Sequence, residues 1–273
     1  MLIKLSSISL NVEVYPSKNP STDFIFLLHG FTGSSGDWKQ IVPSICSQFN
    51  LAAVDLIGHG MSDSPEDVSF YSSKSIVEQI TELIKYFTGG KIILAGYSMG
   101  GRAALSFAVK HPEMLKGLIL ESTSAGIEEK SLRTARSNSD NELACYIESH
   151  STGKFIDYWM NIDLFASQKN LPEEKLNAVR SSKLKNNRTG LANTLRGFST
   201  GKMPLLLDQI KKIKCKTLLI TGDLDTKYTL INSELLKQFP AAEHVIVKNA
   251  GHNIHLEKPE DFIRVINSFL NKF

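Results

Sequence analysis

The sequence predicts an α/β fold in which helices cover both faces of a mostly parallel sheet. Three observations support this prediction. Short, continuous apolar runs recur along the chain, as is typical of strands that are buried on both faces. Helical patterns separate these runs, which gives the alternation expected of a doubly wound sheet. This alternation stops only once, between about residues 123 and 203, where no strand pattern is found.

The individual elements follow from these patterns. Alternating apolar residues in LIKLSSISLNVEVYP, residues 2–16, predict an antiparallel hairpin. The runs that predict strands span 24–30, 51–56, 91–96, 115–122, 216–222 and 243–251. The helical patterns span 36–48, 73–88, 98–111, 229–239 and 259–271. We therefore expect residues 1–122 and 204–273 to form an α/β core. Residues 123–203 should form a helical lid over the carboxyl ends of the strands, where such sheets bind ligands.

Composition and charge exclude several functional classes. A chain of 273 residues with 42% hydrophobic and 22% charged side chains is typical of a globular protein. The net charge of +3 is small, and no block of like charges suggests a nucleic-acid partner. No stretch resembles a signal peptide or a membrane span, so we expect a cytoplasmic protein that does not interact with membranes. Nothing in the sequence points to a particular protein partner.

The cysteines give no indication of a metal site or a disulfide framework. Cys46, Cys145 and Cys215 are odd in number, lie far apart and include no C-x-x-C pair. We expect free thiols, no metal and no organic cofactor.

The segment GYSMGGRAALSFA contains a candidate nucleophile. Gly96, Ser98 and Gly100 form the pattern Gly-x-Ser-x-Gly between an apolar run and a helical pattern. In a nucleophile elbow, glycines at these positions allow a sharp turn that lifts the serine hydroxyl above the sheet. The motif is short enough to arise by chance, so its context has to support it.

Two further segments supply that context. TGDLDTK places Asp223 and Asp225 after one predicted strand, and NAGHNIH places His252 and His255 after the last one. Ser, Asp and His in this order match the chain order of a hydrolase triad. We favour Asp225 over Asp223, which we expect to shape the turn. Taken singly, Asp225 could be a turn residue and His252 a surface histidine; their order in the chain favours the triad.

A candidate oxyanion hole precedes the elbow. LLHGFTGSSGDW forms a His-Gly turn after a predicted strand, which brings the backbone N–H of Phe31 toward that of Met99. His29 and His59 lie beside glycines in tight turns, and we expect both to be structural. A serine, a base and two amide donors can attack a carbonyl carbon, or can remove a proton beside a carbonyl and stabilise the enolate.

The arginines favour an acidic substrate. Arg102 lies four residues after Ser98, on the same face of the predicted helix. The planar guanidinium binds carboxylates through paired hydrogen bonds, so arginines around a pocket indicate a ligand with several carboxylates. The alternative is that lid arginines are solvated or pair with lid carboxylates. Five of the seven arginines lie in the predicted lid: Arg133, Arg136, Arg180, Arg188 and Arg196.

Nearly the whole chain resembles the 2-succinyl-6-hydroxy-2,4-cyclohexadiene-1-carboxylate (SHCHC) synthases, lyases of menaquinone biosynthesis with the α/β-hydrolase fold. The resemblance extends through LLHGFTGSS, DLIGHG, GYSMGGRAALSFA, LPEEKLNAVRSSKLKNNRTGLANTLRGFSTG, TGDLDTKY and AGHNIHLEKPEDF. It implies a triad of Ser98, Asp225 and His252. It also implies the following substrate-binding residues: Tyr97, Arg102, Arg136, Trp159 and Arg180. Leu132-Arg133 departs from the Glu-Arg pair common in the family.

The resemblance also implies a reaction, in which a cyclohexene bearing three carboxylates loses pyruvate by elimination without a cofactor. Ser98, activated by His252, would remove the ring proton that is conjugated with the succinyl ketone. Two other functions use the same sequence features. One is a carbon–carbon bond hydrolase or carboxylesterase, for which water is the second substrate. The other is a ligand receptor that makes little catalytic use of the triad.

Overall fold

The computed structural model describes residues 1–18 and 23–273. Within these ranges eight strands form one sheet in the order β1-β2-β4-β3-β5-β6-β7-β8. The strands are β1 (Leu2–Lys4), β2 (Ser9–Tyr15), β3 (Phe24–Leu28), β4 (Asn50–Val54), β5 (Ile92–Tyr97), β6 (Leu115–Glu121), β7 (Lys216–Gly222) and β8 (Ala242–Val247). β1 and β2 form the predicted antiparallel hairpin, β2 is antiparallel to β4, and every other neighbouring pair is parallel.

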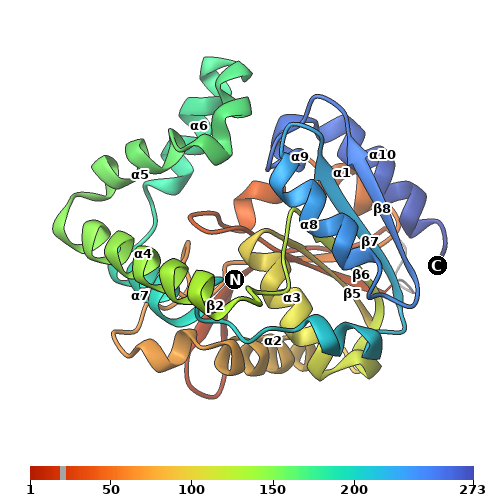
Figure 1. Ribbon diagram of the computed structural model, residues 1–273. Helices are drawn as coiled ribbons and strands as arrows, with labels where there is room; N and C mark the ends of the chain where they lie inside the picture. The colour runs from red at the N-terminus through yellow and green to blue at the C-terminus, as the bar shows by residue number, and fades with distance from the viewer. Residues whose placement is uncertain (19–22) are drawn as a thin grey trace.

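Helices connect the strands and cover the sheet (Figure 1). The α-helices are α1 (Val42–Ile45), α2 (Ser73–Phe87), α3 (Met99–Lys110), α4 (Lys130–Ser149), α5 (Thr152–Met160), α6 (Glu173–Lys183), α7 (Arg188–Phe198), α8 (Thr226–Leu236), α9 (Ile254–Glu257) and α10 (Pro259–Leu270). The 3₁₀ helices are η1 (Ser35–Trp38), η2 (Val68–Tyr71), η3 (Pro112–Met114), η4 (Asp163–Asn170) and η5 (Leu207–Lys212).

Two hydrophobic clusters show that both faces of the sheet are buried. On one face, side chains of β3, β5 and β6 pack against α2, α3 and α8. On the other face, the alternate side chains of the same strands pack against η1, α1 and α10. Successive strand side chains point to opposite faces, which is why these strands are apolar throughout rather than alternating. The predicted α/β fold with helices on both faces is confirmed.

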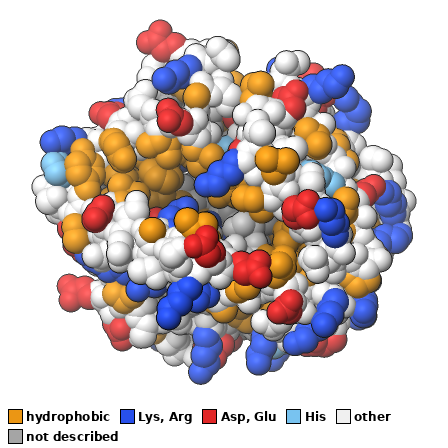
Figure 2. Space-filling view, viewed as in Figure 1, with side chains coloured by type: hydrophobic (Ala, Val, Ile, Leu, Met, Phe, Trp, Pro, Cys, Tyr) orange, Lys and Arg blue, Asp and Glu red, His pale blue; other side chains and the backbone are white. Residues whose placement is uncertain are grey.

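The segment between β6 and β7, all of it described, contains helices and no strand. Its helices α4, α5 and α7 share a small apolar cluster of their own, which includes Ile147, Phe155 and Leu191. Figure 1 shows α4, α5 and α6 extending away from the sheet, and Lys175 of α6 donates a hydrogen bond to the carbonyl oxygen of Leu256 in α9. The same view of the surface shows hydrophobic side chains gathered over α4 and α5, beside a central hollow (Figure 2).

Some predicted boundaries were wrong, for local reasons. The expected helix 36–48 is divided into η1 and α1, with Pro43 in the first turn of the second helix. The expected helix 229–239 begins earlier, at Thr226, because the Asp225 side chain accepts a hydrogen bond from the Tyr228 N–H and so caps it. The last strand ends at Val247 instead of 251. Among the described residues, no helix is both long and apolar enough to cross a membrane.

Candidate active site

Ser98 lies in a strained turn between β5 and α3. Its φ of 49° and ψ of −105° lie in a region that L-residues rarely adopt. The glycines around it allow close backbone packing: a Cβ on Gly100 would lie 2.1 Å from the carbonyl oxygen of Leu28, and one on Gly96 2.3 Å from that of Gly100. Residues with side chains are excluded at both positions. The sequence pattern therefore corresponds to a turn whose geometry requires these glycines.

Ser98, His252 and Asp225 form a continuous chain of hydrogen-bonding groups. His252 Nε2 lies 3.0 Å from Ser98 Oγ, and His252 Nδ1 lies 2.6 Å from Asp225 Oδ2. The His252 and Asp225 side chains are only 1% and 6% exposed. A carboxylate at Nδ1 favours the tautomer with its proton there, which leaves Nε2 free to accept the proton of the serine hydroxyl.

The structure distinguishes the two candidate aspartates. Asp223 is exposed, and its backbone N–H donates to the carbonyl of Val247 at 3.0 Å. Asp225 is buried and is the one whose carboxylate meets the imidazole. The capping bond from Tyr228 holds the second oxygen of Asp225, so that its orientation is set by the start of α8.

The backbone N–H groups of Phe31 and Met99 are candidate donors to an anion beside Ser98. Both residues line the cavity onto which Ser98 opens. Met99 is the first residue of α3, where an amide has no partner within the helix. Neither N–H donates a hydrogen bond to any described protein group. Two amides are thus available beside the serine hydroxyl.

The cavity at Ser98 has a volume of about 180 Å³ and is lined by aromatic and cationic side chains. Arg102, Arg136 and Lys227 line it, and none of its described lining residues is acidic. The aromatic lining residues are Phe31, Tyr97, Trp159, Phe165, Phe198 and Tyr228. A positive, acid-free cavity with apolar walls favours an anionic ligand that also presents apolar surface.

Arg102 is a buried cation that lacks a carboxylate partner among the described residues. It is 8% exposed; Nη2 donates to the carbonyl oxygen of Phe198 at 3.3 Å, and Nε is buried without a partner. Its guanidinium lies 5.6 Å from the centre of the Phe198 ring. Burial, together with repulsion from Arg136, lowers the pKa of Arg102 to about 10. A ligand carboxylate would stabilise this cation and satisfy the donor that remains.

Three lid arginines differ from Arg102 because carboxylates of the protein already pair with them. Arg136 reaches the cavity, but its Nε lies 2.8 Å from both carboxylate oxygens of Asp140. Arg180 is not brought to the cavity: it donates to Asp157 at 2.6 and 3.1 Å, and this pairing raises the pKa of Arg180. Arg196 pairs with Glu148. Among the described arginines, only Arg102 and Arg136 line the Ser98 cavity, and Arg180 and Arg196 pair with carboxylates elsewhere.

Tyr97 and Trp159, the two aromatic residues implied by the family resemblance, both line the cavity. The buried Tyr97 ring lies 5.4 Å from that of His252 and 5.1 Å from that of His255. Trp159 packs edge-on against Phe31 at 5.2 Å, and its buried Nε1 has no described partner. The helical segment between β6 and β7 thus contributes an aromatic side chain, with one N–H donor that has no described partner, to the lining of the Ser98 cavity.

Comparisons with known proteins identify the family. The family model described as the α/β hydrolase fold matches residues 23–259. A Bacillus subtilis (strain 168) protein named as a candidate SHCHC synthase is 38% identical over 250 residues, which is 92% of this chain and 91% of that protein. The chain belongs to the SHCHC synthase family of α/β hydrolases.

Other members of the SHCHC synthase family are similar over the same extent. The SHCHC synthase of Yersinia enterocolitica is 29% identical, over 94% of this chain and 90% of the relative. The solved structure of MenH from S. aureus superposes with a TM-score of 0.92 at 30% identity, over 96% of this chain and 98% of that one. The similarity therefore includes the lid helices as well as the sheet.

Sequence reasoning missed several residues that surround the imidazole in this family member. Tyr228 lies 4.5 Å and Phe165 6.1 Å from the His252 ring, measured between ring centres. Burial raises the pKa of Tyr228. Tyr228 could have been found from its place three residues after Asp225, one helical turn away. Phe165 lies in η4, and no sequence pattern marks its position.

A second histidine–carboxylate pair lies behind Tyr97 and was also missed. His255 Nδ1 is 2.6 Å from Glu121 Oε2, and both side chains are 1% exposed. Glu121 also accepts the backbone N–H groups of Ile254 and His255, at 2.7 and 3.1 Å. The His255 ring stacks on Trp38 at 4.4 Å. These contacts hold the chain that follows His252, which makes the pair a support for the imidazole.

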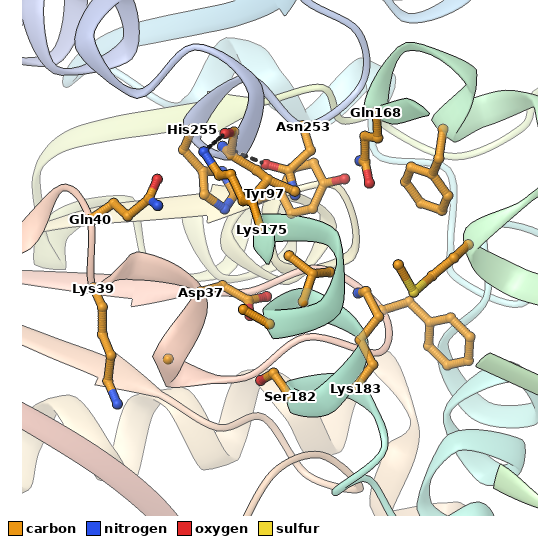
Figure 3. A pocket seen from close by; sticks show the side chains of 17 residues that line it. Asp37, Lys39, Gln40, Tyr97, Gln168, Lys175, Ser182, Lys183, Asn253 and His255 are labelled. Carbon is orange, nitrogen blue, oxygen red and sulfur yellow. Dashed lines mark hydrogen bonds between the residues drawn. The ribbon is translucent and has the colours of Figure 1, made fainter. Parts of the chain in front are cut away.

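A second cavity, of about 250 Å³, adjoins the first (Figure 3). The two cavities share Phe31, Tyr97 and Phe165 as lining residues. The second is bounded by α6, η1 and α9, and it includes Lys175 and Lys183 of α6. Within the described ranges, no group of three or more His, Cys, Asp or Glu side chains is placed to hold a metal ion.

Proposed function

We propose that the protein is a carbon–oxygen lyase of menaquinone biosynthesis. Its substrate would be 2-succinyl-5-enolpyruvyl-6-hydroxy-3-cyclohexene-1-carboxylate, and its products pyruvate and SHCHC. The names of the B. subtilis and Yersinia relatives support this reaction. The observation that carries the proposal is that the buried Arg102, which has no described carboxylate partner, shares a cavity with Ser98, whose hydroxyl lies 3.0 Å from His252 Nε2. A cytoplasmic location stays a prediction from sequence.

Proton abstraction would begin at Ser98. His252 accepts the serine proton while Asp225 stabilises the resulting imidazolium. The serine oxygen then takes the ring proton at C2, which lies beside the succinyl ketone. The electrons of that C–H bond move into the carbonyl, and the developing oxyanion accepts hydrogen bonds from the N–H groups of Phe31 and Met99.

Elimination would complete the reaction without water. As the ketone re-forms, the electrons shift through the ring, a C–C double bond forms, and the bond between C5 and the enolpyruvyl oxygen breaks. Pyruvate leaves as its enolate and takes up a proton, which returns the protein to its starting charge. The aromatic walls exclude solvent and so strengthen the hydrogen bonds to the developing anion.

The substrate-binding residues in this proposal are those that line the Ser98 cavity. Arg102 would bind one carboxylate directly, because no described carboxylate of the protein competes for it. Arg136 would contribute its remaining donors while Nε stays with Asp140. Tyr97 and Trp159 would pack against the ring. Arg180 is left out because Asp157 holds its guanidinium.

The decisive test is incubation of the purified protein with the enolpyruvyl substrate, followed by an enzymatic assay for pyruvate. We expect stoichiometric pyruvate and the absorbance of a new conjugated diene. A carboxylesterase would instead hydrolyse simple esters and release no pyruvate from this substrate. A receptor would bind the substrate without turnover. Either result would exclude the lyase.

A further inference from the structure

The second cavity is unusual for the charge it contains. Three lysines, Lys39, Lys175 and Lys183, line it with a single acidic residue, Asp37. Lys39 is 65% exposed and pairs with Glu13 at 3.6 Å, outside the cavity. Figure 3 shows Lys39 directed away from the cavity, whereas the Lys183 ammonium points toward its middle. Two cations therefore remain to act on a molecule inside it.

Neither Lys175 nor Lys183 forms an ion pair with a described carboxylate. Lys183 Nζ donates to the hydroxyl of Thr32 at 2.8 Å, and Lys175 Nζ to the carbonyl oxygen of Leu256 at 2.5 Å. Each contact is to a neutral oxygen, and an ammonium has three donors. Burial lowers the pKa of both lysines, and this effect is only partly opposed by Glu257 at Lys175 and by Asp37 at Lys183. An anion in the cavity would stabilise both charged forms.

Lys183 is also tied to the candidate oxyanion loop. Its hydrogen-bond acceptor, Thr32, is the residue after Phe31, whose N–H is one of the two donors beside Ser98. Asn186, three residues beyond Lys183, donates to the Thr32 carbonyl oxygen at 2.8 Å. Thr32 itself has a φ of 66°. The Lys183 ammonium is thus fixed next to the place where the substrate ketone would bind.

The succinyl arm of the substrate would extend from the first cavity toward the second. If the succinyl ketone accepts hydrogen bonds from Phe31 and Met99, the rest of that arm, two methylene groups and a carboxylate, has to continue past this point. Phe31, Tyr97 and Phe165 line both cavities, so the second cavity adjoins the Ser98 cavity at these residues. The carboxylate at the end of the arm would then reach the Lys183 side.

We propose that Lys183, assisted by Lys175, forms an anion subsite that binds the terminal carboxylate of the succinyl arm and so positions the substrate for proton abstraction at Ser98. This inference rests on the proposed function and adds a specificity-determining residue to it. Lys183 touches the substrate at a distance from the reacting bonds, and Arg102 is left to bind a carboxylate nearer the ring.

The test compares the natural substrate with an analogue in which the succinyl carboxylate is a primary amide, an uncharged group of the same shape. We expect wild-type protein to prefer the carboxylate by about 10- to 100-fold in kcat/KM. Lys183→Gln keeps a hydrogen-bond donor for Thr32 but loses the charge. This variant should reduce the preference to within about threefold. The Lys183 ammonium and the substrate carboxylate act as one coupled pair, so removal of either group removes their interaction. Lys183→Arg should restore part of it.

Lys185→Gln is the matched control, because Lys185 is an exposed lysine just beyond α6 and should leave the preference unchanged. The melting temperature of each variant reports on the fold. If Lys183→Gln lowers activity equally for both substrates, Lys183 only holds the loop at Thr32 and the subsite is disproved. If wild-type protein does not distinguish the two substrates, the subsite is likewise disproved. Failure of wild-type protein to release any pyruvate would instead overturn the proposed function.

Discussion

The candidate site consists of two parts of different origin. We call the part built on the strand ends the floor, and the part built on the helices between β6 and β7 the roof. The floor consists of residues in the turns that follow strands, together with Arg102 on the helix after Ser98. The turn residues are Phe31 after β3, Ser98 after β5, Asp225 after β7 and His252 after β8. The roof consists of Arg136 on α4, Trp159 on α5 and Phe165 on η4. Parallel strands end at one edge of a sheet, so topology alone brings the floor residues together. Packing of the lid helices against one another places the roof residues.

This difference extends to how charges are satisfied. On the floor, polar groups are oriented toward one another, as in the contacts of His252 with Ser98 and Asp225. On the lid, most arginines are held by lid carboxylates such as Asp157 and Glu148. Arg102 belongs to the floor, on α3, and no described carboxylate holds it. The floor is therefore where we expect the chemistry to be concentrated, whereas Arg102 of the floor and the proposed Lys183 subsite on α6 share the recognition of charge.

We expect the largest effect on pyruvate release from substitutions of Ser98 and His252, at the centre of the floor. Ser98→Ala and His252→Ala should each reduce pyruvate release by about 10³-fold or more, because members of a triad act as a unit. The double variant should be no worse than the single ones. Both proteins should keep the wild-type melting temperature. Steady-state kinetics would contradict the assignment if Ser98→Ala retained more than roughly a tenth of the rate.

Substitutions of Arg102 and Arg136 compare a floor residue with a roof residue in their effects on kcat/KM and on melting temperature. Arg102→Met removes a contact to a substrate carboxylate worth about 2–4 kcal/mol, which is a loss of roughly 30- to 1000-fold in kcat/KM. Its melting temperature should be unchanged or higher, because a buried cation without a carboxylate partner is removed. Lysine at this position should restore only part of the activity, since it lacks the planar fork.

Arg136→Met should behave in the opposite way. It leaves Asp140, which is 4% exposed, without its cationic partner, so the melting temperature should fall. The loss in kcat/KM should be smaller than for Arg102→Met. Thermal melts and kinetics on the same preparations check both expectations. A destabilised but kinetically normal Arg102→Met would remove Arg102 from the substrate site.

The smallest expected effect is a decrease in the free energy of unfolding at acidic pH, caused by the buried His59. Burial lowers the pKa of His59 from 6.5 to about 3. Below pH 6.5 the unfolded chain binds a proton that folded His59 does not, so stability falls as the pH falls. The loss from this residue is about 2 kcal/mol at pH 5. Urea unfolding at pH 7 and pH 5 should show a smaller difference for His59→Gln than for wild-type protein.

The same division explains what could be predicted from the sequence. Strand ends, the elbow glycines and the order of Ser98, Asp225 and His252 are local patterns whose spatial meaning follows from sheet topology. The choice of Asp225 over Asp223 also agrees with the geometry, because only Asp225 both caps α8 and meets the imidazole.

The lid could not be predicted in the same way. The pairing of Arg180 with Asp157 joins α6 to α5 across 23 residues, and the contact of Lys183 with Thr32 spans 151. Such contacts depend on how helices pack in three dimensions, and no periodicity in the sequence encodes them. The second cavity, with Lys175 and Lys183, was missed for this reason.

The most direct test of the central claim, that this floor catalyses an elimination, is turnover in water labelled with oxygen-18. Both products are trapped rapidly, before the pyruvate ketone exchanges with solvent, and analysed by mass spectrometry. We expect pyruvate and SHCHC to be unlabelled at formation, since no solvent oxygen enters when a C–H and a C–O bond break within the substrate. Label in a newly formed carboxylate would mean that Ser98 and His252 activate water, and that the protein is a hydrolase.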